Sequence, residues 1–461
     1  MDISQPPVNK TILLSISVIT SFLNPFMGAA VNIALPKIGQ EFGMNAIWMS
    51  WIAMAFLLAS AVTLVPAGKL ADIIGRKRVF IYGNIIVAVA SVLCAVSVSG
   101  TMLIAFRLLQ GFGAAMIFGT GMAIITSAFP PSERGKIIGI NVTAVYLGLS
   151  LAPVMGGFLT QTLGWRSLFF LTVPISFFAA LSMYYFIKAE WKGAPNETFD
   201  IKGSVVYVLA MTAFMFGFSK LPDPTAIAVA VSGFIGLIMF VKLELKTTYP
   251  VVNIQLFKNN RIFAFSNLAA LINYAATFAI SFVLSLYLQY VKGLSPRDAG
   301  MLLITQPLVM AIFASVSGRL SDRYDSRILS SLGMGIIVIG LILLSFLNAD
   351  TGSSYLIICM IILGSGFGIF SSPNTNSVMG SVENKYLGVA SATVSTMRVT
   401  GQMMSMGIAT LIIHIFIGEA KISSENISSF ISSIKVIFLV FSVLCTLGVF
   451  ASLARGKKIK Y

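Results

Sequence analysis

The sequence predicts an all-α integral membrane protein with fourteen transmembrane helices, and three observations support this prediction. First, 57% of the 461 residues are hydrophobic and 10% are charged, whereas soluble domains contain about 25% charged residues. Second, apolar runs of about 20 residues, enough to cross a hydrocarbon core, recur along the whole chain. Third, positive charges gather in alternate loops. Together these observations argue against a water-soluble fold.

The uneven distribution of positive charge predicts the orientation of the chain. The net charge is +15, from 31 Lys and Arg against 16 Asp and Glu. Most of the Lys and Arg residues fall in loops on one side of the predicted helices, including the run Arg76–Arg78 and the tail 455–460. By the positive-inside rule this side is cytoplasmic. We therefore expect a multi-pass protein of the cell (cytoplasmic) membrane with both termini in the cytoplasm, and no nucleic-acid partner.

Charged residues and Gly/Pro breaks divide the apolar runs into individual helices. The first run exceeds a signal-peptide core and lacks a small-residue cleavage site, so we predict a retained helix. The first six helices are expected at 12–35, 47–69, 79–98, 102–128, 137–162 and 167–188. Two further helices are expected at 201–219 and 224–242. A second group of six is expected at 263–290, 299–318, 327–348, 354–374, 386–417 and 430–453.

These elements define three predicted regions. Residues 1–188 form an N-terminal six-helix bundle, and residues 189–262 form a linker region with two extra transmembrane helices. Residues 263–461 form a C-terminal six-helix bundle and a short basic cytoplasmic tail.

A short repeat indicates that the two groups of six helices are related. Gly68-Lys-Leu-Ala-Asp72 and Gly318-Arg-Leu-Ser-Asp322 each follow the second helix of their group. Two related bundles in one chain can rock around a central site and expose it to each side of the membrane in turn. The repeat therefore favours a transporter over a receptor or an enzyme.

The stretch from Gly68 to Arg78 resembles the loop between helices two and three of the major facilitator superfamily. Its residue types suit such a loop: Gly68 permits close helix approach, and Gly75 permits a tight turn. Asp72 can accept hydrogen bonds from a helix N-terminus, and Arg76 can hold the loop at an anionic membrane face. The alternative is a charge cluster that only sets topology.

In that superfamily this loop latches the two bundles in one conformation. The resemblance carries the latch role to Gly68, Asp72, Gly75 and Arg76, and to Gly318 and Asp322 of the second copy, which lacks the second glycine. It also implies the major facilitator fold, here with two extra helices between the two six-helix bundles.

The fourth predicted helix carries Arg107 and Gln110 in a segment similar to the superfamily's fourth-helix motif. Placing an arginine within a helix in the membrane costs roughly 2.5–3.5 kcal/mol, so such a residue normally faces the protein interior and has a partner. The alternative is a side chain that extends to the headgroups. The resemblance implies a role for Arg107 and Gln110 in proton coupling or substrate contact.

The fifth predicted helix contains a motif similar to the one shared by the superfamily's exporters. Its informative residues are Gly148, Pro153, Gly156 and Gly157, with Ala152 in place of the usual glycine. Small residues permit close packing and a proline can kink a helix, so the motif suits a pivot. It favours export over import.

The helix count and the segment Gly388–Gly401 resemble the fourteen-helix drug:proton antiporter branch of the superfamily. Many members carry an aspartate in helix one at the position that is Met27 here. None of the Asp and Glu residues falls within a predicted helix. Because buried carboxylates are the usual proton carriers in transporters, the coupling ion stays open.

Polar residues in the helices that line the superfamily's central cavity are candidate substrate contacts: Asn24, Asn273, Tyr274 and Gln306. The alternative is hydrogen bonding between helices, worth about 0.6 kcal/mol. The intramembrane charges include Arg107 and Arg398, and both are positive.

Two functions remain open at this point. The first is a proton-coupled exporter of small amphiphilic compounds or drugs, acting as a monomer in contact with membrane lipid. The second is an ion-coupled transporter of one metabolite, which the positive intramembrane charges would make anionic. No nucleophile–base pair, metal cluster or phosphate-binding loop is readable, so we expect neither an enzyme nor a cofactor.

Overall fold

The computed structural model describes residues 8–221, 223–321, 324–382 and 387–456. Within these ranges the chain forms helices and loops and no strands. Fourteen segments are long and apolar enough to cross a membrane, which confirms the predicted all-α membrane fold.

The N-terminal half contains six membrane-spanning helices: α1 (Lys10–Phe42), α2 (Ala46–Ile74), α3 (Arg76–Ala95), α4 (Gly100–Ala128), α5 (Pro131–Thr162) and α6 (Arg166–Phe186). The first of these is longer than predicted, because it continues through Pro36 to Phe42. Gly43 follows with φ of 65°, and its N–H donates to the carbonyl of Gly39. Glycine adopts this left-handed conformation without strain, so Gly43 and not Pro36 sets the end of α1.

The two extra helices are α7 (Ile201–Ser219) and α8 (Pro224–Glu244). The hydroxyl of Tyr207 on α7 donates to the carbonyl of Ala61 on α2, at 3.1 Å. The Phe218 ring lies against Gly407, 2.8 Å from where a Cβ on that glycine would be. Helix α7 therefore contacts both halves of the molecule.

The C-terminal half begins with a short helix that was not predicted, α9 (Ile254–Asn259). Six spans follow. The first is made of α10 (Arg261–Thr277), α11 (Ile280–Leu286) and η1 (Tyr287–Val291), and the second of α12 (Pro296–Leu303) and α13 (Thr305–Leu320). The other four are α14 (Ser326–Leu344), α15 (Ser353–Met379), α16 (Leu387–Ile417) and α17 (Ile427–Ala454).

The span predicted as one helix at 263–290 is interrupted after Thr277. The hydroxyl of Ser405 on α16 accepts a hydrogen bond from the backbone N–H of Ala279, at 3.0 Å. A side chain inserted into the backbone ladder is a recognised cause of a helix break. The interruption thus depends on a residue more than a hundred positions away along the chain.

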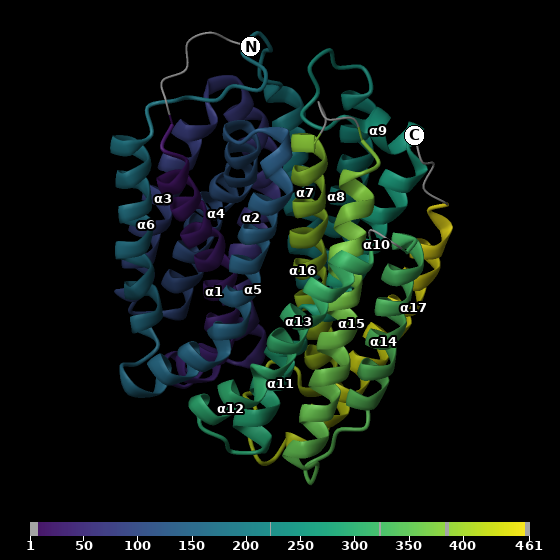
Figure 1. Ribbon diagram of the computed structural model, residues 1–461. Helices are drawn as coiled ribbons and strands as arrows, with labels where there is room; N and C mark the ends of the chain where they lie inside the picture. The colour runs from purple at the N-terminus through teal and green to yellow at the C-terminus, as the bar shows by residue number, and fades with distance from the viewer. Residues whose placement is uncertain (1–7, 222, 322–323, 383–386, 457–461) are drawn as a thin grey trace.

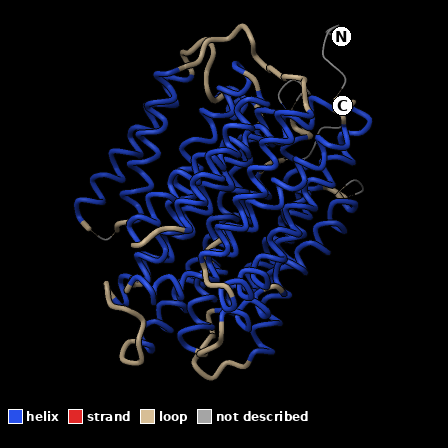
Figure 2. The backbone as a smooth tube through the Cα atoms, turned by 90° about the vertical axis from the view of Figure 1, so that its left-hand side faces the viewer, coloured by secondary structure: helices blue, strands red, loops and turns tan. Residues whose placement is uncertain are grey.

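The two halves lie side by side, with the purple and blue half next to the green and yellow half (Figure 1). The helices run between two ends of the molecule, where the loops gather (Figure 2). We call the end where α1 begins and α17 ends the basic face, and the opposite end the far face. These names refer to the two ends of the molecule and do not specify a side of the membrane.

Because the helices are longer than predicted, five carboxylates lie inside helices, which corrects the prediction that none would. They are Glu41, Asp72, Glu133, Glu244 and Asp298. Each is one of the first three or the last three residues of its helix. No described carboxylate lies deeper in a membrane-spanning segment.

Candidate functional site

Arg107 is buried inside the N-terminal half, with 1% of its surface exposed. Its Nε donates to the carbonyl of Ile52 on α2 at 3.0 Å, and its guanidinium lies 4.4 Å from the centre of the Phe56 ring. A terminal nitrogen donates to Oε1 of Gln110 on its own helix. Arg107 therefore faces the bundle interior, and its burial argues against the alternative that it extends to the headgroups.

Gln110 carries this network to a third helix. Its Nε2 donates to the hydroxyl of Ser91 on α3 at 2.7 Å, and Ser91 in turn donates to the carbonyl of Val87. The pair Arg107 and Gln110 thus ties α2, α3 and α4 together. No carboxylate of the described residues pairs with Arg107, so it is a fixed positive charge in an otherwise apolar region.

The glycines of α5 lie at two close helix crossings. A Cβ added to Gly148 would come within 2.3 Å of the Phe22 carbonyl oxygen on α1, and one added to Gly156 would come within 3.0 Å of Ala30. Neither site has room for a larger side chain without movement of α1. Gly148 and Gly156 are therefore required by the packing of α5 on α1.

The neighbouring part of α5 contacts the other half of the molecule. A Cβ on Gly157 would lie 2.4 Å from the carbonyl oxygen of Pro296 on α12, and a Cβ on Gly300 would lie 2.1 Å from the carbonyl oxygen of Pro153. The four motif residues therefore place α5 against α1 of its own half and against α12 of the opposite half.

Further contacts join the two halves near the far face. Asn32 Nδ2 donates to the Ser281 hydroxyl at 3.2 Å, and the Ser285 hydroxyl donates to the Asn32 carbonyl at 3.0 Å. In the loops, Asn45 donates to the carbonyl of Glu419 at 2.9 Å. These contacts, together with the α5–α12 crossing, hold the two halves together near the far face.

The latch loop contacts the segment that follows α6. Asp72 accepts a hydrogen bond from Nε of Arg76 at 2.7 Å, and the Asp72 carbonyl accepts one from the N–H of Ala194. The N–H of Arg76 donates to the Trp191 carbonyl. In this conformation the described contacts of the loop lie within the N-terminal half and its connector, and a latch between the halves stays a proposal.

Gly75 is held in a conformation that other residues rarely adopt, with φ of 127°. A Cβ there would lie 2.5 Å from the carboxyl carbon of Glu190, whose Oε1 accepts from the N–H of Lys77 at 2.9 Å. Gly68 differs, since no described atom lies within 4 Å of a Cβ placed there. The Gly68 backbone nevertheless lies 3.6 Å from where a Cβ on Gly119 of α4 would be, so α2 and α4 approach each other there.

We expect Gly75→Ala to destabilise the protein by about 1–3 kcal/mol, because the change adds backbone strain and displaces the Glu190 carboxylate. Thermal unfolding in detergent measures this change. Gly68→Ala is the matched control in the same motif, and its effect should stay within about 0.5 kcal/mol. Equal unfolding midpoints for the two variants would contradict the structural role of Gly75.

The second copy of the motif is only partly described. A Cβ on Gly318 would lie 2.9 Å from the Ser372 hydroxyl on α15, and Asn376 donates to the hydroxyl of Ser321 at 2.7 Å. Asp322 lies outside the described residues. The described residues of this second copy thus lie where α13 packs on α15.

The four candidate substrate contacts fall into two pairs. Asn24 and Asn273 are buried, at 7% and 0% exposure. Asn24 donates to the Thr20 carbonyl on its own helix, while neither side-chain polar atom of Asn273 has a hydrogen-bond partner. Tyr274 and Gln306 are partly exposed, and the ring of Tyr274 packs edge-on against Phe367.

A further contact between the halves, like those near the far face, was missed by sequence reasoning. The hydroxyls of Tyr146 on α5 and Ser371 on α15 form a hydrogen bond of 2.7 Å. Tyr146 lies in the same helix as the exporter motif, but neither its type nor its spacing indicates a partner in the other half. This bond lies nearer the middle of the helices than the far-face contacts do.

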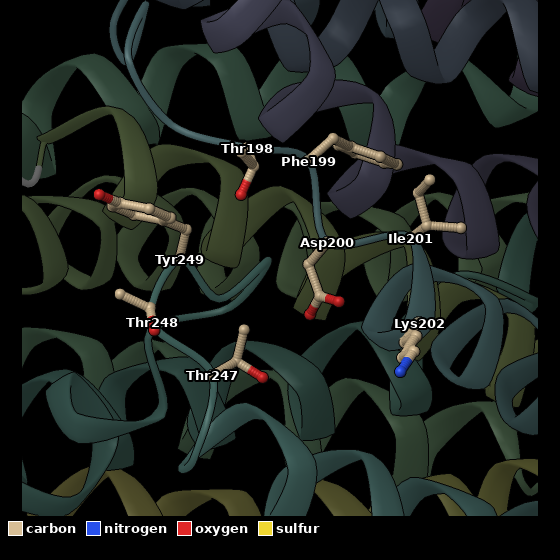
Figure 3. Close-up of a pocket in the computed structure, with 8 residues that line it drawn as sticks. All are labelled: Thr198, Phe199, Asp200, Ile201, Lys202, Thr247, Thr248 and Tyr249. Carbon is tan, nitrogen blue, oxygen red and sulfur yellow. The ribbon is translucent and has the colours of Figure 1, made fainter.

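A cavity of about 350 Å³ lies at the basic face, between the segment before α7 and the segment after α8. Figure 3 shows the Asp200 carboxylate directed into the space between these segments. The lining comes from the connectors and from the start of α7: Thr198, Phe199, Asp200, Ile201, Lys202, Thr247, Thr248 and Tyr249. Because neither six-helix group lines this cavity, we do not assign it to substrate passage. Among the described residues no cluster of three metal-ligating side chains is present.

Comparison with known proteins gives one family match that covers most of the chain. The family model described as Major Facilitator Superfamily matches residues 17–406 and 266–458. The riboflavin transporter RibZ of Clostridioides difficile is 30% identical over 424 residues, which is 92% of each chain. The multidrug resistance protein Stp of Mycobacterium tuberculosis is 26% identical over 87% of this chain and 76% of its own.

Solved structures share the fold at lower sequence identity. A bacterial homologue of the human lysosomal transporter Spinster superimposes with a TM-score of 0.68 at 15% identity, covering 98% of this chain and 97% of its own. At that identity the likeness concerns the fold alone.

Proposed function

Since the chain belongs to the major facilitator superfamily, and is therefore a transporter and not an enzyme, we propose that it is a secondary active exporter of small amphiphilic compounds. The two halves would rock against each other and expose a central site to each side of the membrane in turn. A proton gradient would supply the driving force. The protein is a multi-pass membrane protein, and we place it in the cell membrane as a monomer, with the basic face in the cytoplasm.

The packing of α5 is the observation that most supports export by alternating access. The exporter motif brings α5 into backbone contact with α1 through Gly148 and Gly156, and with α12 of the other half through Gly157. A contact without intervening side chains can separate and re-form with little repacking. We therefore propose that the α5–α12 crossing is the gate at the far face, and that the latch loop at the basic face stabilises one state.

Coupling is proposed to involve the Arg107–Gln110 network. This network holds α2, α3 and α4 together. A movement of one of these helices would therefore move the others. The guanidinium stays protonated in proteins, and its role would be to set the local electric field and not to carry the proton. Asn24, Asn273, Tyr274 and Gln306 are proposed substrate contacts.

A second candidate function is transport of one metabolite. It is favoured by the 30% identity to a protein named as a riboflavin transporter. Relatives named for multidrug resistance favour the first candidate. The two functions differ in substrate range and share the fold and the gate.

Uptake into inside-out membrane vesicles distinguishes these candidates. With an imposed proton gradient, we expect the vesicles to take up several amphiphilic dyes of different structure, and riboflavin in addition. Uptake of riboflavin alone would favour the second candidate. Absence of uptake for every solute, or faster uptake in right-side-out vesicles, would contradict the exporter.

A further inference from the structure

Arg398 lies deep within α16, far from either end of the helix. Helix α16 begins at Leu387 and ends at Ile417, so Arg398 lies about 16 Å along the axis from the basic-face end, at 1.5 Å per residue. Arg398 therefore lies inside the membrane-spanning segment Val389–Ile417 and not at its end.

The guanidinium of Arg398 has no hydrogen-bond or ion-pair partner among the residues that the structure describes. Its Nε is buried and makes no hydrogen bond. Its one aromatic contact is with Phe118 on α4, 5.7 Å from the guanidinium carbon to the ring centre. The side chain is partly exposed, and its contact with Phe118 places it where α16 faces α4 of the other half.

The two fully buried arginines, in contrast, both have hydrogen-bond partners. Arg107 is satisfied by Ile52 and Gln110. Arg455 donates to Ser266 and Asn374, each at 3.2 Å. A charged residue within a membrane-spanning segment is costly, and such residues usually face the bundle interior or a water-filled cavity and mark substrate or ion pathways.

The surroundings of Arg398 come from both halves and are aromatic. Phe118 belongs to α4, and Tyr146 on α5 lies within electrostatic range of both Arg398 and Tyr274. Tyr146 also bonds Ser371 of the other half. Described carboxylates all lie in loops or in terminal turns of helices, so none neutralises Arg398 at this level.

We propose that Arg398 is a substrate-binding residue that selects amphiphiles carrying an anionic group, a carboxylate or a phosphate. The guanidinium forms charge-assisted hydrogen bonds with the anion, and the aromatic part of the substrate packs against Phe118 and Tyr146. This inference rests on the proposed function, because it names the substrate class of the central site of an exporter. On this proposal, the anionic group of the bound substrate pairs with the positive charge of Arg398.

Direct binding to the purified protein in detergent tests the proposal. Two xanthene dyes of similar size are the probes, anionic fluorescein and a cationic rhodamine methyl ester, with fluorescence anisotropy as the readout. We expect Arg398→Gln to weaken fluorescein binding by about tenfold or more and to leave rhodamine binding unchanged or stronger. Arg398→Lys should recover part of the affinity for fluorescein. Lys258→Gln, which removes an exposed positive charge on α9, is the charge-matched control and should bind both dyes like the wild type.

Three results would overturn the proposal. They are equal fluorescein affinity in the wild type and Arg398→Gln, an equal loss for both dyes, or no fluorescein binding by the wild type at millimolar concentration. An equal loss is what a purely structural role of Arg398 would produce.

Transport of the same dyes into proteoliposomes separates this inference from the proposed function. Binding of fluorescein that depends on Arg398, without transport of any solute, would contradict the exporter and support the anion site. Transport of rhodamine that is unchanged in Arg398→Gln, without fluorescein binding, would support the exporter and contradict the anion site.

Discussion

Gly157→Val is expected to reduce transport at least tenfold while the protein remains folded. The Cβ alone would lie 2.4 Å from the carbonyl oxygen of Pro296, a separation that packed side chains do not adopt. The clash occurs between the halves and can be relieved by moving α5 away from α12. The variant should therefore favour a state in which the far face is open. Solute uptake in proteoliposomes measures the loss of transport.

Opening of the far face can be measured in the same variant. Ser281 bonds Asn32 across the closed far face, so a cysteine at position 281 should react faster with a membrane-impermeant thiol reagent when Gly157→Val is present. Gly335→Ala is the control, since no described atom lies within 4 Å of a Cβ there, and it should transport normally. Unchanged transport and unchanged labelling in Gly157→Val would show that the α5–α12 crossing is not a gate.

Arg107→Ala is expected to cause the second largest loss of transport. The change leaves the Oε1 of Gln110 without its donor, while the carbonyl of Ile52 keeps its bond within α2; an unsatisfied buried polar group costs about 1–3 kcal/mol. Both stability and transport should fall, and transport should fall at least tenfold because α2, α3 and α4 lose their common partner. Thermal unfolding and dye uptake measure the two losses.

Arg107→Lys separates charge from geometry. Lysine keeps the positive charge but lacks the planar set of donors that reaches Ile52 and Gln110 together. If the field of the charge is what matters, Arg107→Lys should retain most of the transport that Arg107→Ala loses. If neither variant differs from the exposed-site control Lys258→Gln, the network has no part in coupling.

The number of spans could be predicted from the sequence because each apolar run is a local signal. The interior position of Arg107 also followed from a local argument, the cost of an arginine in the membrane. The length of α1 could not be predicted in this way, because α1 ends at the left-handed Gly43 and not at Pro36, where the predicted helix stopped. Helix ends are set by backbone geometry that hydropathy does not report.

Features that join distant segments were beyond the sequence. The break in the first span of the C-terminal half depends on the Ser405 hydroxyl, and the connector packs on the latch loop through Glu190. Serine and glutamate are common in loops and helices alike, so no pattern marks these two. Gly68 is a motif residue whose own Cβ position is open, although its backbone lies close to Gly119 of α4.

Movement of protons together with solute tests the central claim most directly. Purified protein is reconstituted into proteoliposomes that contain a pH-sensitive dye, and solute uptake is recorded with an imposed proton gradient and without one. The account predicts solute accumulation against its own gradient, a matching proton flux in the opposite direction, and loss of both in Gly157→Val. Solute movement that only equilibrates, and is the same with and without the proton gradient, would contradict it.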